Sequence, residues 1–517
     1  MPASRPAWLP VFLAEAPMQF LTDLSAGFDA VFTLHAAGFV LLGTLLGIIV
    51  GATPGLSSGM AVAVLLPLTF TMDSLTGLVF LTSVYVAVTY GGAVTAIMLN
   101  TPGAPENAAT ALDGHALTRL GQSGRALGVA IAASALGGLL SYFVMLFGIS
   151  SVASIALTFG PTEIFLIALS GVMILGAVGS GSPAKILASG MFGLLVGTIG
   201  IVPTGEWRAT FGEPYLADGV QIVPVLIGMF VVAELLVLSH RETVVDAATE
   251  VNRSIGATVA GFREVLSHPV TLLRSSFLGM GVGLIPAAGA TLAAFSSYTL
   301  ARRLSREPER YGKGSIEGIV AAESANNACS GGALTVSLVL GVPGSVATAV
   351  ILGALTMQGL QPGPMMVVQQ PTLVYGLVIA AILSQPVMVL FAILAGSVMS
   401  RALTISTRVL VPFLLMLSIY GTFALRNATF DVWMTLGFGV LGYFMKRYGY
   451  SPAALVMGVI LAKITDAELV RTMQIFGDDW YFAFFQRPIS LAILAILTAS
   501  LLRAGLGARR RRLPSDE

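Results

Sequence analysis

Polar side chains that could bind an anion gather where the apolar sequence is broken by proline and glycine. The stretch that begins at Tyr90 is apolar up to Leu99 and then contains amides, hydroxyls and a Pro-Gly turn. Such a turn leaves the next helix with free N–H groups at its start, and these favour anions. At this turn and two related ones the candidate substrate-binding residues are Pro54, Gly55, Ser57, Asn100, Pro102, Gly103, Thr110, Pro343, Gly344 and Thr348.

A second polar group could bind a cation. Glu323, Asn326 and Asn327 have the i, i+3, i+4 spacing that places side chains on one face of a helix, and apolar residues surround them. An acid inside a membrane segment is costly and indicates function, so these three residues are candidates for coupling to Na⁺ or H⁺. In the alternative interpretation Glu323 is neutralised by basic residues of the segment 302–313.

The sequence contains no pattern typical of a catalytic centre. The four histidines and the single cysteine, Cys329, do not form a cluster with metal-ligand spacing, and no nucleophile with an adjacent base is apparent. We therefore predict no enzymatic activity, no catalytic residue, no metal site and no cofactor other than the coupling ion. The net charge of +1 gives no indication of nucleic-acid binding.

Composition places these residues in a membrane. The 517 residues are 56% hydrophobic and only 10% charged, and the mean hydropathy is +0.87. Apolar stretches recur along almost the whole chain, which predicts an all-α polytopic membrane protein with roughly 11–13 crossings. The apolar segments 57–70, 345–360 and 451–463 are too short to cross and are expected to be broken or re-entrant.

Charged loops predict which ends face the cytoplasm, because basic loops stay inside. The segments expected to be cytoplasmic are 114–125, 301–313, Lys446-Arg447 and the C-terminal arginines 509–512, whereas the acidic loop 203–219 is expected outside. If the polar segment 241–274 is also cytoplasmic, residues 275–300 must turn back inside the membrane; otherwise one of the two flanking loops is misassigned. Asp113 is expected to pair with Arg119 or Arg125.

An internal repeat relates the two halves of the chain. The motif Gly-x-x-x-Gly-x-x-Pro occurs at 47–54 and at 279–286, and Gly-Gly-Ala-x-Thr followed by Pro-Gly occurs at 91–103 and at 331–344. The basic loop follows the second motif in the first half and precedes it in the second half. The halves are therefore expected to be inverted, as in many secondary transporters.

These boundaries divide the chain into five parts. The parts are an interfacial N-terminal segment (1–29), a first transmembrane repeat (30–240), a polar connector (241–274), a second repeat with trailing helices (275–505) and a basic cytoplasmic tail (506–517).

Motifs along the chain resemble the large permease subunit of tripartite tricarboxylate transporters. The motifs that carry the resemblance include Gly51-Ala52-Thr53-Pro54-Gly55, Tyr90-Gly91-Gly92, Ala109 to Gly114, Glu323 to Ala328, Leu340 to Ser345 and Gly359 to Pro364. They occur in order over roughly residues 30–505, close to the whole chain. One departure from the family pattern is Pro286-Ala287, where Pro-Gly is more usual.

The resemblance implies uptake of a di- or tricarboxylate across the bacterial inner membrane by cation symport. It also implies two protein partners, a small transmembrane subunit and a periplasmic substrate-binding protein, besides the membrane lipid. The alternatives are a carboxylate-permeable channel and a transporter of another small organic anion. Polar residues that cluster at breaks between long apolar runs favour alternating access over a continuous pore.

Overall fold

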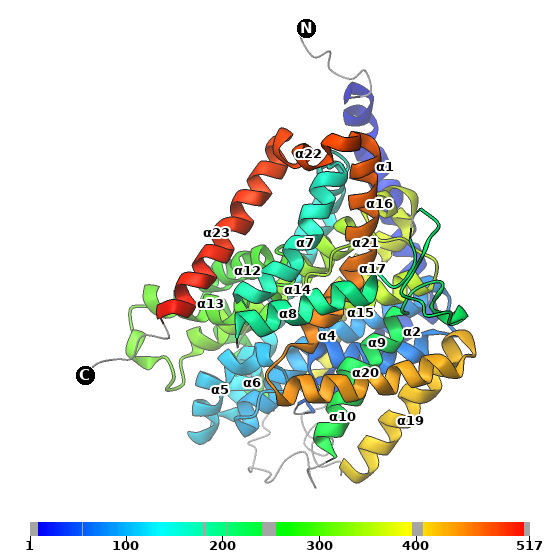
Figure 1. Ribbon diagram of the computed structural model, residues 1–517. Helices are drawn as coiled ribbons and strands as arrows, with labels where there is room; N and C mark the ends of the chain where they lie inside the picture. Colours follow the sequence, from blue (N-terminus) through cyan, green and yellow to red (C-terminus); the bar gives the residue numbers. More distant parts are fainter. Residues whose placement is uncertain are drawn as a thin grey trace.

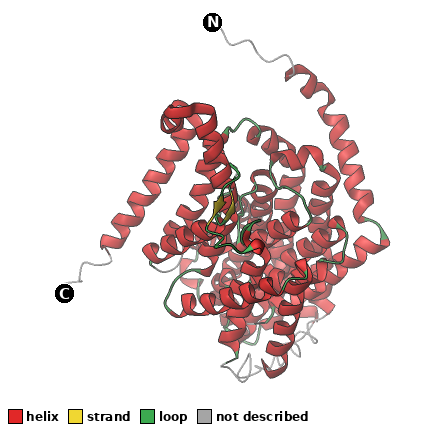
Figure 2. Ribbon diagram, turned by 45° about the vertical axis from the view of Figure 1, so that its right-hand side comes forward, coloured by secondary structure: helices red, strands yellow, loops and turns green. Residues whose placement is uncertain are grey.

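A computed structural model describes residues 9–53, 55–178, 182–202, 204–239, 255–394 and 407–510. Within these ranges the chain is almost entirely helical, apart from a short antiparallel pair of strands that lies among the helices (Figure 2). Four described helices are long and apolar enough to cross a membrane: α2 (Leu34–Gly51), α4 (Ser74–Leu99), α6 (Ser123–Ala156) and α17 (Pro371–Leu394). The chain is thus an all-α polytopic membrane protein, as predicted, while the expected number of crossings stays a prediction.

The remaining elements connect and surround these four helices (Figure 1). In the first half they are α1 (Leu9–Val31), α3 (Ser58–Leu65), η1 (Leu66–Thr69), η2 (Pro105–Asn107), α5 (Ala108–Arg119), α7 (Pro161–Val178), α8 (Pro183–Gly197), β1 (Gly200–Ile201), β2 (Trp207–Arg208), η3 (Pro214–Leu216), α9 (Ile222–Leu226), the π-helical η4 (Ile227–Val232) and α10 (Ala233–Leu238). In the second half they are α11 (Ile255–Glu264), η5 (Val265–Ser267), α12 (Pro269–Gly283), α13 (Gly289–Leu304), η6 (Pro308–Arg310), α14 (Ile316–Leu340), α15 (Val346–Met357), α16 (Pro364–Gln369), α19 (Thr407–Arg426), α20 (Thr429–Arg447), α21 (Pro452–Phe476), η7 (Gly477–Asp479), α22 (Trp480–Gln486) and α23 (Pro488–Arg510).

Helices α4 and α14 form the centre of the molecule, and nearly all of their side chains are buried. Their apolar residues are spread around the whole helix rather than along one stripe, which is typical of a helix enclosed on every side. The two helices run in opposite directions. The start of α14 lies beside α5, because Asp113 accepts from the Ser315 amide at 2.8 Å, and α5 itself lies at the end of α4, where Thr118 donates to the Ile97 carbonyl.

Glycines allow the long helices of each half to approach backbone to backbone. A Cβ atom on Gly47 of α2 would lie 2.6 Å from the carbonyl oxygen of Val84 in α4. A Cβ atom on Gly279 of α12 would lie 2.2 Å from the carbonyl oxygen of Ala325 in α14. Small residues serve this close approach in membrane helices, and it occurs both between α2 and α4 and between α12 and α14.

Residues 275–300 do turn back on themselves. Pro286 and Ala287 separate α12 from α13, and Glu317 at the start of α14 accepts hydrogen bonds from Thr271 at 2.7 Å and from Ser305 at 2.9 Å. The start of α12 and the end of α13 therefore lie at the same end of the molecule. The two flanking loops can both face the cytoplasm without conflict.

One predicted short segment differs from the structure. The segment 451–463 was expected to be short, which is wrong: it forms the first half of α21, which continues to Phe476. Beyond the apolar residues, Asp466 of this helix pairs with Arg208 at 3.0 Å. The connector 241–274 contains α11 and the start of α12, and its residues 241–254 lie outside the described ranges, as do 1–8 and 511–517.

Residues 9–31 form one continuous helix, α1, although Pro10 and Pro17 lie within it. Helix α1 extends over 23 residues and packs against α17, where Phe20 meets the ring of Tyr375 edge-on at 5.8 Å. Its prolines lie in its first half, and its second half carries the contact. Whether this helix occupies the membrane interface stays a prediction.

Replacing Gly279 with alanine tests the close packing of α12 on α14. The added methyl group would meet backbone atoms that cannot move aside, so we expect a loss of about 2 kcal/mol in stability and a lower melting temperature in detergent. Gly281, in the same helix, has no atom within 4 Å of a Cβ position, so Gly281→Ala is the matched control and should be neutral. Equal melting temperatures for the two variants would contradict the packing described here.

Candidate functional site

The Pro102-Gly103 turn is packed against the ends of α2 and α4. A Cβ atom on Gly103 would lie 2.4 Å from the Gly51 carbonyl oxygen and 2.6 Å from the Gly92 Cα, so only glycine fits. The Gly103 amide donates to the Gly92 carbonyl at 3.2 Å and is not a free donor in this structure. Asn100 caps α4 in a left-handed conformation (φ 54°) and is exposed.

The Pro343-Gly344 turn is closed in a similar way by α14. The Gly344 amide donates to the Ser337 hydroxyl at 3.2 Å, and a Cβ atom on Gly344 would lie 2.6 Å from the Ala333 Cα. The Pro343 carbonyl accepts from the Ala287 amide at 3.1 Å, which joins this turn to the α12–α13 turn. The amides of Gly103 and Gly344 therefore both have an acceptor within the protein. In this conformation neither is free to bind a substrate as predicted.

Helix α15 begins directly after that turn with a complete capping box. The Ser345 hydroxyl accepts from the Thr348 amide at 3.2 Å, and the Thr348 hydroxyl accepts from the Ser345 amide at 3.0 Å. The Ser345 hydroxyl also lies 3.3 Å from the Tyr85 hydroxyl of α4. The start of α15, in the second half, therefore contacts α4, the central helix of the first half. Thr348 is fully buried at this contact.

The first turn, before α3, is more open. Pro54 lies outside the described residues, Gly55 is exposed with φ +87°, and the Ser57 hydroxyl caps α3 by accepting from the Met60 amide at 3.4 Å. A Cβ atom on Gly55 would lie 3.6 Å from the Glu234 carboxylate. The structure thus does not gather all ten candidate substrate residues around one point.

Glu323 lies at the contact between the halves and is fully buried. One of its carboxylate oxygens accepts from Thr110 of α5, and the other accepts from Ser134 of α6 at 2.7 Å. Asn327 donates to the Glu323 main-chain carbonyl at 3.2 Å. Thr110, a candidate for the substrate, is therefore joined to Glu323, a candidate for the cation, and the basic segment 302–313 does not pair with Glu323.

Two asparagines of this region have buried polar atoms without a hydrogen-bond partner. Both side-chain polar atoms of Asn326 are buried without a hydrogen-bond partner, and so is Oδ1 of Asn107. Buried polar groups in proteins are almost always paired, so an unpaired one is a candidate binding group. The predicted site residue Asn326 is accordingly the one with the most free bonding capacity.

Sequence reasoning missed four residues of this region: Glu106, Asn107, Ser134 and Tyr85. Glu106 is buried between the Pro102-Gly103 turn and α3, near the Ser58 hydroxyl, and Asn107 donates to the Thr89 carbonyl at 3.0 Å. Glu106 and Asn107 belong to the polar stretch after Leu99 that indicated the turn, so the sequence pattern could have identified them. Ser134 and Tyr85 lie within apolar spans and gave no signal.

Two other buried acids have structural partners. Asp113 accepts through one oxygen from the amides of Gly312, Gly314 and Ser315, and through the other from the Tyr298 hydroxyl at 2.8 Å. The prediction that Asp113 pairs with Arg119 or Arg125 is wrong, because the loop before α14 supplies backbone donors; Arg125 binds Glu264 instead, at 2.7 Å.

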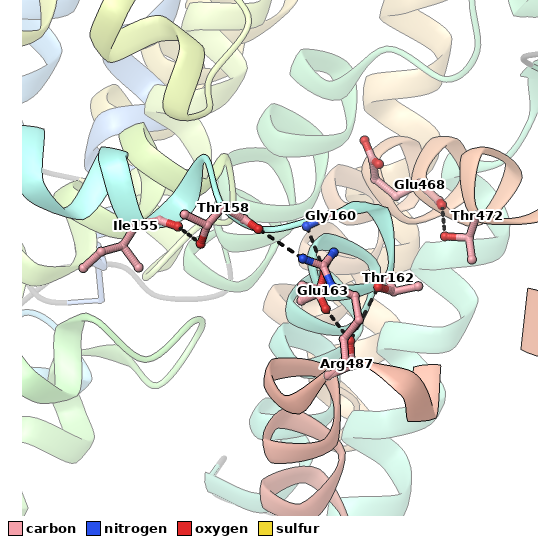
Figure 3. Close-up of polar contacts among 9 residues, drawn as sticks. Ile155, Thr158, Gly160, Thr162, Glu163, Glu468, Thr472 and Arg487 are labelled. Carbon is pink, nitrogen blue, oxygen red and sulfur yellow. Dashed lines mark hydrogen bonds and ion pairs between the residues drawn. The ribbon is translucent and has the colours of Figure 1, made fainter. Parts of the chain in front are cut away.

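Glu163 is held by an ion pair between α7 and the chain just before α23 (Figure 3). Arg487 donates to it at 2.7 Å, as does Ser490 at 2.6 Å, and the Gly160 amide donates at 2.8 Å. Its charge and lone pairs are therefore satisfied within the protein. This distinguishes it from Glu106 and Glu323, for which no ion pair occurs in the described part of the chain.

Comparison with known proteins agrees with the resemblance noted in the sequence. The profile of the tripartite tricarboxylate transporter TctA family matches residues 38–457. An uncharacterised 52.8 kDa protein in the TAR-I ttuC' 3' region of Agrobacterium vitis is 33% identical over 494 residues, which cover 95% of this chain and 98% of the relative. Another uncharacterised protein, in the TAR-II ttuC' 3' region of the same organism, is 33% identical over 218 residues, 42% of this chain and 90% of the relative. No solved structure matches the chain.

Removing Arg487 tests whether the Glu163 ion pair is structural. The variant Arg487→Ala leaves a buried carboxylate uncompensated, so we expect a loss of about 3 kcal/mol, at the low end for a broken buried pair because Arg487 is 40% exposed. The double variant Glu163→Gln/Arg487→Ala should regain part of that loss in a thermal unfolding assay. A double variant that is less stable than Arg487→Ala alone would contradict this interpretation.

Proposed function

Because the chain belongs to the tripartite tricarboxylate transporter TctA family, we propose that it takes up a di- or tricarboxylate across the bacterial inner membrane by cation symport. It would be the large permease of a three-part system, working with a small transmembrane subunit and a periplasmic substrate-binding protein. The family is one of transporters, which agrees with the expected absence of a catalytic centre.

In this proposal the two halves are inverted repeats. Each half has a helix, a proline turn, a short helix, a central long helix, a Pro-Gly turn and a further short helix, in that order. The central helices α4 and α14 are antiparallel, and the glycine contacts of α2 with α4 match those of α12 with α14. A substrate site between inverted repeats is open to each side in turn when one repeat moves against the other.

The substrate would bind between the two central helices, near the start of α15. The observation that carries this proposal is the contact of the short helices after the two Pro-Gly turns with the opposite half: Ser345 meets Tyr85, and Thr110 meets Glu323. The unpaired amide of Asn326 offers a donor for a carboxylate there. The substrate-binding roles of Ser57, Asn100 and Thr348 remain part of the proposal, with N–H groups of the turns exposed when the halves move.

Coupled cations would make uptake of an anion possible. An inside-negative potential opposes uptake by about 2.3 kcal/mol per charge per 100 mV, so a trianion has to enter together with several cations. Glu323 is the carboxylate proposed to bind one of them, with Asn326 and Asn327 beside it. Because flux would then depend on an ion gradient, the mechanism differs measurably from that of a channel.

The variant Thr348→Val tests the proposed substrate site without changing side-chain shape. We expect at least a tenfold loss of citrate uptake by cells that also carry the two partner proteins, since the buried hydroxyl that orders the start of α15 is removed. Thr356→Val, in the same helix and exposed, is the matched control and should transport normally. Thermal unfolding of Thr348→Val in detergent measures the loss of stability, which we expect to be about 1 kcal/mol for a helix cap. A loss of uptake by a variant that still folds is then a loss of transport.

Normal uptake by Thr348→Val would place the substrate elsewhere. Wild-type uptake that saturates with substrate and stops when the ion gradient is dissipated supports the carrier. Flux that rises linearly with substrate and ignores the gradient would overturn symport and favour the channel.

A further inference from the structure

Two pairs of short helices lie at opposite ends of the central helix α4. The chain just after α3 and the end of α15 meet near the start of α4, because a Cβ atom on Gly77 would lie 3.1 Å from the Thr69 Cβ and 3.2 Å from the Gln358 Nε2. Helix α5 packs at the other end of α4, where Thr118 donates to the Ile97 carbonyl at 2.9 Å. One pair is therefore α3 with α15, and the other contains α5.

Each pair takes one helix from each half of the chain. A Cβ atom on Gly59 in α3 would lie 2.8 Å from the Cβ of Val346 in α15, so the starts of these two helices touch. At the other end of α4, Tyr298 of α13 donates to Asp113 of α5 at 2.8 Å. Motion of one half against the other therefore separates the two helices of a pair.

The two pairs begin close together in the middle of the molecule. The Ser345 hydroxyl, just before α15, lies 3.3 Å from the Tyr85 hydroxyl of α4. Asn107, just before α5, donates to the Thr89 carbonyl at 3.0 Å, one turn further along α4. From this level the pairs extend toward opposite ends of α4. A space between their starts would therefore be reached from one side through each pair.

We propose that α3 with α15 forms an outer gate and that α5 with α13 forms an inner gate, and that the two gates open in turn. The inference rests on the proposed function, since it names the contacts that separate during transport. The basic segment 301–313 follows α13 and is expected in the cytoplasm, so the α5–α13 pair faces that side. Because each gate joins the two halves, tilting one half against the other opens one gate and closes the other.

The two gates are closed by different interactions and can be weakened separately. The outer gate has apolar packing of Gly59 against Val346, so Gly59→Ala places a methyl group against a side chain and pushes α15 away. The inner gate has a hydrogen bond between the buried side chains of Tyr298 and Asp113. Tyr298→Phe removes this bond but keeps the ring, and Asp113 keeps its backbone donors.

A single cysteine reports the side to which the centre of the molecule opens. Ser58→Cys adds a thiol at the start of α3, and a membrane-impermeant thiol reagent is applied to spheroplasts from outside or to inverted vesicles from the cytoplasmic side. We expect Gly59→Ala to raise the labelling rate from outside at least threefold. Tyr298→Phe should raise the rate from the cytoplasmic side at least threefold. The native Cys329 is buried, so the chain without Ser58→Cys should stay unlabelled.

Two substitutions away from the gates are the controls. A Cβ atom on Gly281 meets no atom within 4 Å, and Tyr481 is exposed on α22, so Gly281→Ala and Tyr481→Phe should leave both labelling rates unchanged. A gate variant that raises the rate from the opposite side, or equally from both sides, would overturn the assignment of the gates. An unchanged rate in both gate variants would overturn it as well.

Labelling of the native cysteine identifies a gate variant that has lost its fold. If Cys329 becomes reactive in Gly59→Ala, the variant Val346→Ala replaces it, because it removes the same contact from the other helix without adding an atom. The expected result and the contradicting results are the same.

The outcomes separate this inference from the proposed function, because labelling needs neither substrate nor partner proteins. Labelling on the expected side in a chain that does not take up citrate would overturn the proposed function alone. Normal citrate uptake by a chain whose two gate variants show no difference between the sides would overturn the gates alone.

Discussion

Backbone N–H and C=O groups inside a bilayer have no water to bind, so a break in a membrane helix persists only where protein supplies the missing partners. The breaks of this chain obey that constraint. Gly103 donates to a carbonyl at Gly92, Gly344 donates to Ser337, and Ala287 donates to Pro343. Because the partners of both glycines lie on α4 and α14, the Pro-Gly turns have to pack against these central helices, and this placement determines where polar groups enter the membrane interior.

Close packing of the long helices follows from the same constraint. Glycines on α2 and α12 let the backbones of α4 and α14 approach so closely that a Cβ atom would overlap a carbonyl oxygen. Apolar side chains offer little preference for protein over lipid, so such contacts have to stabilise the bundle by themselves. The turns can then be held rigidly at positions where the polar side chains of one half meet those of the other.

The buried acids of the described chain differ in the partners that they have. Glu163 and Asp113 are buried, yet each has donors that satisfy it, and each joins segments far apart in the chain. Glu106 and Glu323 have hydroxyl neighbours but no basic partner among the described residues. Acids without a basic partner in a membrane interior are expensive, and such residues mark candidate functional positions.

The sequence by itself determined the class of the protein and the positions of its breaks, because these depend on local patterns. Hydropathy, Gly-x-x-x-Gly spacing and Pro-Gly turns are read within a few residues. They predicted breaks at Pro102-Gly103 and at Pro343-Gly344, and each of these separates two helices in the structure. The same patterns singled out Glu323 and the polar stretch after Leu99. They also misjudged 451–463, since a loss of hydropathy does not end a helix whose polar residues find partners.

Only the tertiary structure decided which polar residues meet. Thr110 and Glu323 are 213 positions apart, and Tyr85 and Ser345 are 260 positions apart, so no local pattern could pair them. The same holds for Asp113, whose donors are backbone amides that carry no signature in side-chain type. Antiparallel packing of α4 and α14 brings these positions together, so polar residues from two separate breaks contact the opposite half.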